Sequence, residues 1–172
     1  MAVQQAPYQL LEREGSFEIR HYEPLILAVS PETDLGGSSG FGRLFNFISG
    51  QNRDRKKITM TAPVLNDLDQ PQMTIAFVMP AEYQAGTVPQ PENPSVRIRE
   101  VPARKVAAIV FKGTATPEAI ARQRAALINW LEQRHLETIG PIELARYNPP
   151  FIPGIFKRNE LWVELKVPMT IS

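Results

Sequence analysis

The 172-residue chain contains no cysteine and only two histidines. The missing cysteine excludes disulfide bridges, thiol catalysis, iron–sulfur clusters and cysteine-ligated zinc. Because the two histidines lie far apart in the sequence, we do not expect a closed metal site with three or four protein ligands.

The chain also lacks a charge of one sign and any long hydrophobic run. Nineteen basic and 18 acidic side chains give a formal net charge of +1, so we do not expect a nucleic-acid partner. No segment approaches 18 uninterrupted apolar residues, and residues 1–14 lack the pattern of a signal peptide. The sequence therefore predicts a cytoplasmic protein without a membrane span, and its length predicts a single domain over residues 1–172.

Alternating or continuous apolar segments predict strands on both sides of the middle of the chain. The first of them, residues 16–30, has Pro24 within it, which predicts a long strand bent at this proline. The predicted strands cover residues 16–30, 58–65, 73–79, 95–101, 105–112, 142–147 and 160–167.

Two segments have helical periodicity. A Gly/Ser turn over residues 36–40, whose serines can cap a helix, precedes a stripe with the spacing i, i+3, i+4 and i+7. Gly50 should end this helix, which we place at residues 40–49. Thr116 followed by Pro117 has the pattern of an N-cap and first helical residue, and predicts a helix over residues 117–134. Both halves thus follow the order strand, helix, strand, strand, which is typical of a pseudo-twofold α+β barrel.

Four segments together resemble the SOUL/heme-binding-protein family. They read FEIRHY from Phe17, FISGQN from Phe47, KITMTAPV from Lys57, and YNPPF from Tyr147 with RNELW from Arg158. The resemblance implies an α+β fold, a distorted antiparallel β-barrel of two pseudo-twofold β-α-β-β halves flanked by two main helices. It also implies binding of heme or of metal-free porphyrin.

Members of the family bind the tetrapyrrole in different ways, and the resemblance therefore implies two candidate sites. His21 occupies the histidine position of the first segment, where an imidazole is proposed to ligate heme iron. The alternative interpretation of His21 is a half-exposed strand histidine without a ligand. His135, at the end of the second helix, and Met60, in a short strand, are weaker candidates for iron ligation.

The second candidate site is an apolar cleft along the first helix. Its candidate residues are Phe41, Leu44, Phe45 and Ile48. Such a stripe normally packs into the core, so core packing is the alternative interpretation. Where some members carry a lysine on this helix, this chain has Asn46. Propionate groups would then depend on other basic side chains, for which the candidates are Arg43, Lys56, Lys57 and Lys157.

These observations favour a protein that binds heme or metal-free porphyrin for buffering, transport or delivery, without turnover. The sequence does not identify a partner to which the tetrapyrrole would be delivered. Two alternatives stay open. One is a heme-modifying enzyme, such as an iron-releasing dechelatase in which His21 assists proton transfer. The other is a non-heme small-molecule sensor or interaction module on the same fold. Hydrolase chemistry has little support, because neither a Gly-x-Ser-x-Gly elbow nor a positioned pair of carboxylates is present.

Overall fold

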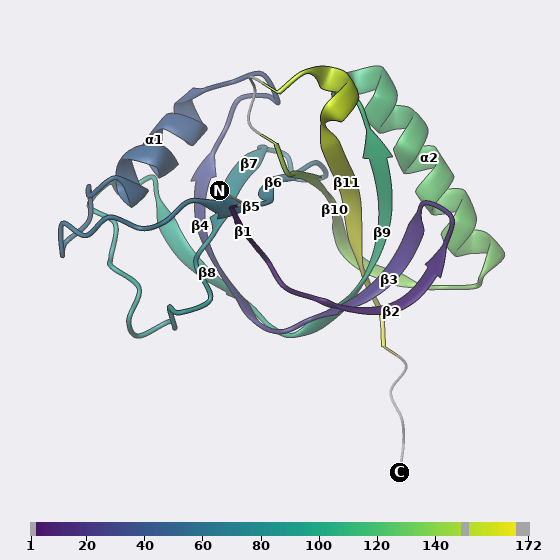
Figure 1. Cartoon of the computed structure of the whole chain (residues 1–172), viewed down its shortest axis with the longest axis horizontal. Coiled ribbons are helices and arrows are strands. Elements are labelled where there is room, and N and C mark those ends of the chain that lie inside the picture. Colours follow the sequence, from purple (N-terminus) through teal and green to yellow (C-terminus); the bar gives the residue numbers. More distant parts are fainter. Residues whose placement is uncertain (1–2, 149–151, 168–172) are drawn as a thin grey trace, which may run out of the picture.

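The computed structural model describes residues 3–148 and 152–167. One sheet with strands of unequal length dominates it, and one helix lies outside this sheet on each side of the molecule (Figure 1). The strands of this sheet are, in spatial order, β2 (Gln9–Glu14), β3 (Phe17–Tyr22), β9 (Arg104–Lys112), β11 (Arg158–Leu165), β10 (Thr138–Arg146), β6 (Val64–Asp67), β7 (Thr74–Val78), β4 (Leu25–Pro31) and β8 (Arg97–Val101). The remaining elements are a parallel pair of β1 (Gln4–Gln5) and β5 (Thr61–Ala62), the helices α1 (Ser39–Ile48) and α2 (Pro117–Gln133), and the 3-10 turn η1 (Gly154–Phe156).

The expected barrel is confirmed only in part. Neighbouring strands of the large sheet are all antiparallel, but the strand order begins at β2 and ends at β8, so the described sheet is open. The predicted bend at Pro24 separates β3 from β4. On one side of this bend β3 pairs with β9, and on the other side β4 pairs with β8. A bent two-stranded ribbon therefore connects the two halves, and the sheet curves like a barrel without closing.

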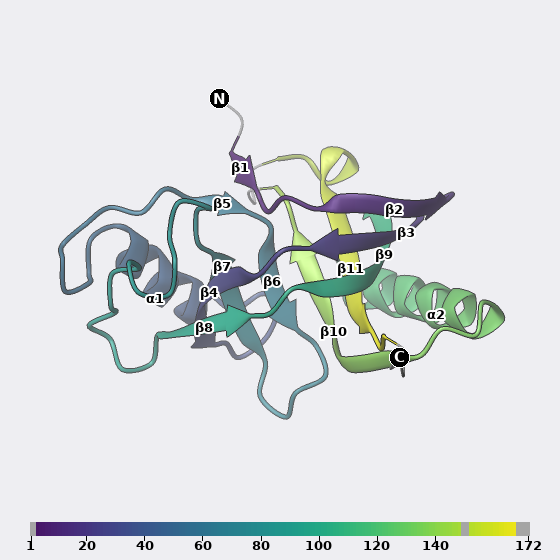
Figure 2. The ribbon, with the colours of Figure 1, turned by 90° about the horizontal axis from the view of Figure 1, so that it is seen from below.

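The side chains form three apolar layers because successive strand residues point to opposite faces. The layer enclosed by the bent sheet contains Tyr22, Leu27, Val29, Leu65, Val106 and Trp162. Leu44 and Phe47 of α1 pack outside β4 and β7, whereas Leu127 and Trp130 of α2 pack outside β9 and β11. The two helices consequently lie at opposite ends of the molecule (Figure 2). No described helix combines the length and apolar character needed to cross a membrane.

The helix starts explain how α1 and α2 are held. As predicted, the Thr116 hydroxyl accepts a hydrogen bond from the Ala119 N–H at 3.1 Å. The predicted serine cap of α1 is wrong, because the Ser38 side chain makes no capping hydrogen bond. The buried carboxylate of Glu32 replaces it and accepts hydrogen bonds from the N–H groups of Gly40 and Phe41 at 2.9 and 3.2 Å. A carboxylate suits this place because free N–H groups and the helix dipole both favour negative charge.

Several boundaries differ from the sequence prediction. The segment over residues 58–65 contains two short strands, β5 and β6, on either side of the cis Ala62–Pro63 bond. The strand predicted at residues 142–147 already begins at Thr138. The strands β1 and β2 were not predicted, and every residue of β2 is exposed. A strand without a buried face has no alternation of apolar and polar residues to reveal it.

Candidate functional site

The solvent-facing side of α1 carries a pair of aromatic side chains. Phe41 is 37% exposed and Phe45 is 51% exposed. Their ring centroids lie 6.2 Å apart and their planes differ by 13°, while Phe41 also meets Phe77 edge-on at 5.2 Å. The core beneath the helix therefore fixes one ring of the pair, and both rings together present an apolar surface to a ligand.

The predicted apolar stripe of α1 divides between two environments. Leu44 and Ile48 are buried together with Phe47 against β4 and β7, whereas Phe41 and Phe45 are not. Leu44 and Ile48 thus hold the helix on the sheet. Packing alone explains why both residues are apolar. That they also line a binding site stays a prediction.

The candidate propionate partners lie in different surroundings. Arg43 donates hydrogen bonds from Nε to Ser30 Oγ at 2.8 Å and from Nη2 to the Pro31 carbonyl at 2.6 Å, so its guanidinium joins α1 to β4. Lys57 is exposed in the loop between α1 and β5. The Lys56 ammonium lies 5.5 Å from the ring centroid of Tyr83, in cation–π geometry. The last candidate, Lys157, is half-buried after η1. Asn46, which stands where some family members have a lysine, is exposed on α1.

His21 is in the other half of the molecule. Its side chain on β3 is 38% exposed, and Nδ1 lies 3.6 Å from Glu23 Oε1. Strand alternation turns the neighbouring residues Arg20 and Tyr22 into the interior and His21 to the outside. Figure 1 shows β3 and α1 on opposite sides. The described structure therefore does not join His21 and the α1 aromatic pair into one site.

The weaker ligand candidates are also separate. His135 is exposed in the turn that follows α2 and has a φ of 54°. Met60 is partly buried against the apolar layer beneath α1. Within residues 3–148 and 152–167, no group of three or more His, Cys, Asp or Glu side chains is arranged to hold a metal ion. Residues 149–151, which belong to the YNPPF segment, lie outside the described residues.

A buried charged network occupies one end of the interior. Arg20 and Glu160 are both fully buried, and they form a bidentate pair with distances of 2.6 Å (Nη1 to Oε1) and 2.9 Å (Nη2 to Oε2). Arg20 also donates from Nε to Glu18 at 2.8 Å. The Trp162 indole donates to Glu160 at 2.7 Å, and the Tyr8 ring lies 4.1 Å from the Arg20 guanidinium carbon. Such a pair is stable inside a protein only because these additional contacts satisfy it.

Ionisation in this network follows from the same contacts. Burial by itself would raise the pKa of Glu160, but the hydrogen bonds and charge of Arg20 lower it below the ordinary glutamate value. Burial raises the pKa of Tyr22 and of Tyr147, and the nearby Glu160 charge raises both further. The Arg20–Glu160 pair thus stays charged and both phenols stay neutral at neutral pH. Sequence reasoning missed it, because Arg20 and Glu160 are 140 positions apart.

The geometry defines an α+β protein with a bent antiparallel sheet, two outer helices and an exposed aromatic pair on one of them. A model of the SOUL heme-binding protein family matches residues 3–164, so the chain belongs to that family. The resemblance in the sequence is thereby confirmed.

Named relatives agree with this membership, and solved structures share the fold. Heme-binding protein 2 of Mus musculus is 28% identical over 170 residues, which cover 92% of this chain and 82% of the relative. Heme-binding protein 1 of Xenopus laevis is 27% identical over 163 residues, covering 88% and 85% of the two chains. The EcmrR C-terminal domain matches with a TM-score of 0.64 at 11% identity, over 92% of this chain and 98% of that one. A hydrolase from Listeria innocua matches with a TM-score of 0.62 at 10% identity, over 90% and 94% of the chains. At such low identity these two structures show a shared fold alone.

Proposed function

We propose that the protein binds heme or metal-free porphyrin reversibly on the outer surface of α1, for buffering, transport or delivery and without turnover. The observation that carries this proposal is the exposed Phe41–Phe45 pair in a chain of the SOUL heme-binding family. A tetrapyrrole is a flat apolar plate with two anionic propionates. Two aromatic rings inclined by 13° offer such a plate an apolar contact, because large apolar surfaces supply most of the affinity in ligand sites.

The charges around α1 suit the propionate groups. Lys57 is exposed and makes no ion pair among the described residues, so its ammonium is available to a carboxylate. Arg43 contributes less, because its Nε and Nη2 donors already bind β4. We therefore expect Lys57 to be the main partner of a propionate. Arg43 instead holds α1 in its orientation on β4. The pairing adds orientation and a modest part of the affinity, since exposed ion pairs are weak.

Iron ligation by His21 is an alternative to the α1 site, because His21 lies on β3 on the other side of the molecule (Figure 1). The imidazole is partly exposed, and its Nδ1 faces the carboxylate of Glu23. A carboxylate on one ring nitrogen orients an imidazole for ligation through the other. If His21 binds ferric heme, His21→Ala should change the Soret band and weaken hemin binding, while binding of metal-free protoporphyrin should stay the same. If the hemin spectrum and affinity of this variant match the parent protein, the iron ligand is not His21.

The α1 site is tested with a double variant, Phe41→Ala with Phe45→Ala. Removing both exposed rings should weaken hemin and protoporphyrin equally, by roughly tenfold, because the lost contact is apolar and independent of iron. Absorbance titration measures the affinities, and thermal unfolding shows that the fold is intact. Ile128→Ala is the matched control, since Ile128 is an exposed apolar residue of the other helix. Parent-like affinity in the folded double variant would refute the α1 site.

A further inference from the structure

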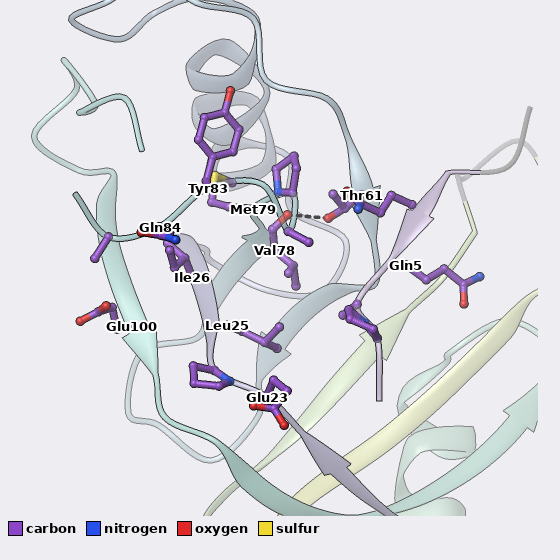
Figure 3. A pocket seen from close by; sticks show the side chains of 17 residues that line it. Gln5, Glu23, Leu25, Ile26, Thr61, Val78, Met79, Tyr83, Gln84 and Glu100 are labelled. Carbon is purple, nitrogen blue, oxygen red and sulfur yellow. Dashed lines mark hydrogen bonds between the residues drawn. The ribbon is translucent and has the colours of Figure 1, made fainter. Parts of the chain in front are cut away.

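A groove separate from the α1 aromatic pair opens beside the N-terminal segment. Three pieces of chain form its walls: residues 4–7, the bend between β3 and β4 at residues 23–26, and residues 78–85 at the end of β7 and beyond (Figure 3). Its volume is about 370 Å³. This value lies near the lower end of the range of small-molecule sites, which is about 300–1,000 Å³. The groove therefore has room for a compact molecule with one ring.

The walls of the groove are held by hydrogen bonds that do not need a ligand. The pair of β1 and β5, together with the bond from the Ala6 N–H to the Ala62 carbonyl at 2.9 Å, ties the N-terminal segment to the sheet. The Thr61 hydroxyl donates to the Val78 carbonyl at 2.5 Å, which holds β5 against the wall formed by residues 78–85 (Figure 3). The groove is thus a preformed feature of the described fold.

The floor of the groove is apolar. Leu25 and Val78 belong to the layer inside the bent sheet, and Met79 belongs to the layer below α1. All three are buried in the core, so their positions are fixed by packing on the far side. Tyr83 adds an aromatic wall, and Figure 3 shows its side chain at the end of the groove away from Glu23. An apolar body can therefore lie on this floor and against this ring.

The charged side chains that line the groove are both acidic, and the nearby Lys56 ammonium, 5.5 Å from the Tyr83 ring centroid, is not among the lining residues. Among the described residues that line it, the ionisable acids are Glu23 and Glu100, and neither lysine, arginine nor histidine is present. Glu100 is exposed on β8 and pairs in register with Ile26 on β4, which places it at the rim. Glu23 has a side chain that is 78% exposed, with His21 as its neighbour at 3.6 Å. The rim therefore disfavours the propionates of a porphyrin and favours a cation.

We propose that this groove is a second ligand site, which takes a small organic cation with an apolar body. The ring of the ligand would lie on the Leu25, Val78 and Met79 floor, and its positive group would lie near Glu23 and Glu100. The separation of the apolar end from the acidic rim sets the orientation of the ligand. This site is independent of the proposed tetrapyrrole site, because it shares no residue with the Phe41–Phe45 pair.

Three phenyl compounds of similar size test the proposal by their charge: benzyltrimethylammonium, its neutral carbon analogue neopentylbenzene, and 3-phenylpropionate. Binding is followed by NMR titration of the full chain at about pH 8 and low salt, which keeps screening of exposed charges small. The cation should bind most tightly, the neutral compound less tightly and the anion least. Equal affinities, or a preference for 3-phenylpropionate, would overturn the proposal.

Two variants locate the binding. Glu23→Gln with Glu100→Gln should weaken benzyltrimethylammonium roughly fivefold, as expected for two exposed charge pairs, and leave neopentylbenzene unchanged. Glu82→Gln is the control, because Glu82 is an exposed acid of the neighbouring loop that does not line the groove. Ala81→Trp should fill the groove and abolish binding of both compounds, whereas the exposed control Ala103→Trp should not.

A further titration keeps the two sites distinguishable. Phe45→Ala should leave benzyltrimethylammonium binding unchanged, whether or not it affects hemin. If Ala81→Trp folds and still binds the cation with the parent affinity, the groove is not the site. If Phe45→Ala abolishes cation binding, the cation binds at α1 and the proposed second site is wrong.

Discussion

The two helices occupy equivalent places in the two halves of the chain, yet their aromatic pairs are opposite in exposure. On α2, Trp130 is buried and stacks on Phe17 of β3, with centroids 4.8 Å apart and planes differing by 3°. On α1, the Phe41–Phe45 stack faces solvent. The α2 pair thus completes the core, whereas the α1 pair leaves apolar surface uncovered. Exposed aromatic surface of this kind is characteristic of binding sites.

The polar anchors of the two ends differ in the same way. The strands beside α2, β3 and β11, contain the fully buried Arg20–Glu160 pair. The α1 end is anchored by Glu32, which binds N–H groups at the helix start. We therefore expect substitutions at the α2 end to lower the free energy of unfolding more than substitutions at the α1 end. Four variants, in order of decreasing expected effect, test this division.

The largest effect is expected at the buried ion pair. Arg20→Met removes the buried partner of Glu160, which then keeps only the partly exposed Arg158 as a cationic neighbour, and should lower the free energy of unfolding by about 3–5 kcal/mol. Arg13→Met is the matched control, because Arg13 also binds Glu18, at 3.0 Å, but its side chain is 60% exposed. The control should lose less than about 1 kcal/mol. Chemical denaturation measures both, and similar losses in the two variants would contradict the assignment.

The next effect compares the aromatic pairs directly. Trp130→Ala removes a ring that stacks on Phe17 and donates to Glu14 at 3.1 Å, and should cost about 3 kcal/mol. Phe45→Ala removes an exposed ring and should cost no more than about 0.5 kcal/mol. Thermal and chemical unfolding of the two variants give the comparison. A loss at Phe45 as large as that at Trp130 would mean that the α1 pair is structural.

A smaller effect is expected at the start of α1. Glu32→Gln removes the charge that accepts hydrogen bonds from Gly40 and Phe41, and should cost about 1–2 kcal/mol at neutral pH. Burial would raise the pKa of Glu32, but its hydrogen bonds lower it below the ordinary glutamate value. A carboxylate with a lowered pKa stabilises the fold above the ordinary value of about 4.3, and this contribution is lost as the pH falls below it. The difference between parent and variant should therefore shrink in acid. A difference that is constant from neutral pH to about pH 3 would contradict the charged cap.

How far the fold could be predicted depended on whether its signals were local. Thr116 and Pro117 gave the start of α2 correctly, because both the cap and the first turn lie within a few residues. The cap of α1 was predicted wrongly, since Glu32 precedes the helix by seven residues and reaches it only in three dimensions. The Arg20–Glu160 pair had no local signal at all.

The candidate site shows the same limit. Spacing placed Phe41, Leu44, Phe45 and Ile48 on one stripe, but the sheet decides which arc of a helix is covered. Contacts from β4 and β7 bury Leu44 and Ile48 and add Phe47, which the stripe did not contain. The groove was missed for a related reason. Its walls come from three segments far apart in the chain, and no single one of them resembles a site.

The smallest effect is expected from adding one charge to α1. Asn46 stands where the family resemblance led us to expect a lysine, and it is exposed. If the tetrapyrrole lies on the outer surface of α1, Asn46→Lys should strengthen hemin binding by roughly two- to fivefold, because a new exposed ion pair with a propionate is worth less than about 1 kcal/mol. The free energy of unfolding should not change.

Two controls separate this effect from a general change in charge. Asn129→Lys adds the same charge at an exposed position of α2, where no tetrapyrrole is proposed, and should leave the affinity unchanged. Hemin dimethyl ester has neutral propionate esters, so Asn46→Lys should not strengthen its binding. Raising the salt concentration should reduce the gain for hemin, since salt screens exposed charges. An equal gain from lysine on either helix would show that net charge acts at long range, and the contrast between a binding α1 and a structural α2 would no longer hold for the propionates.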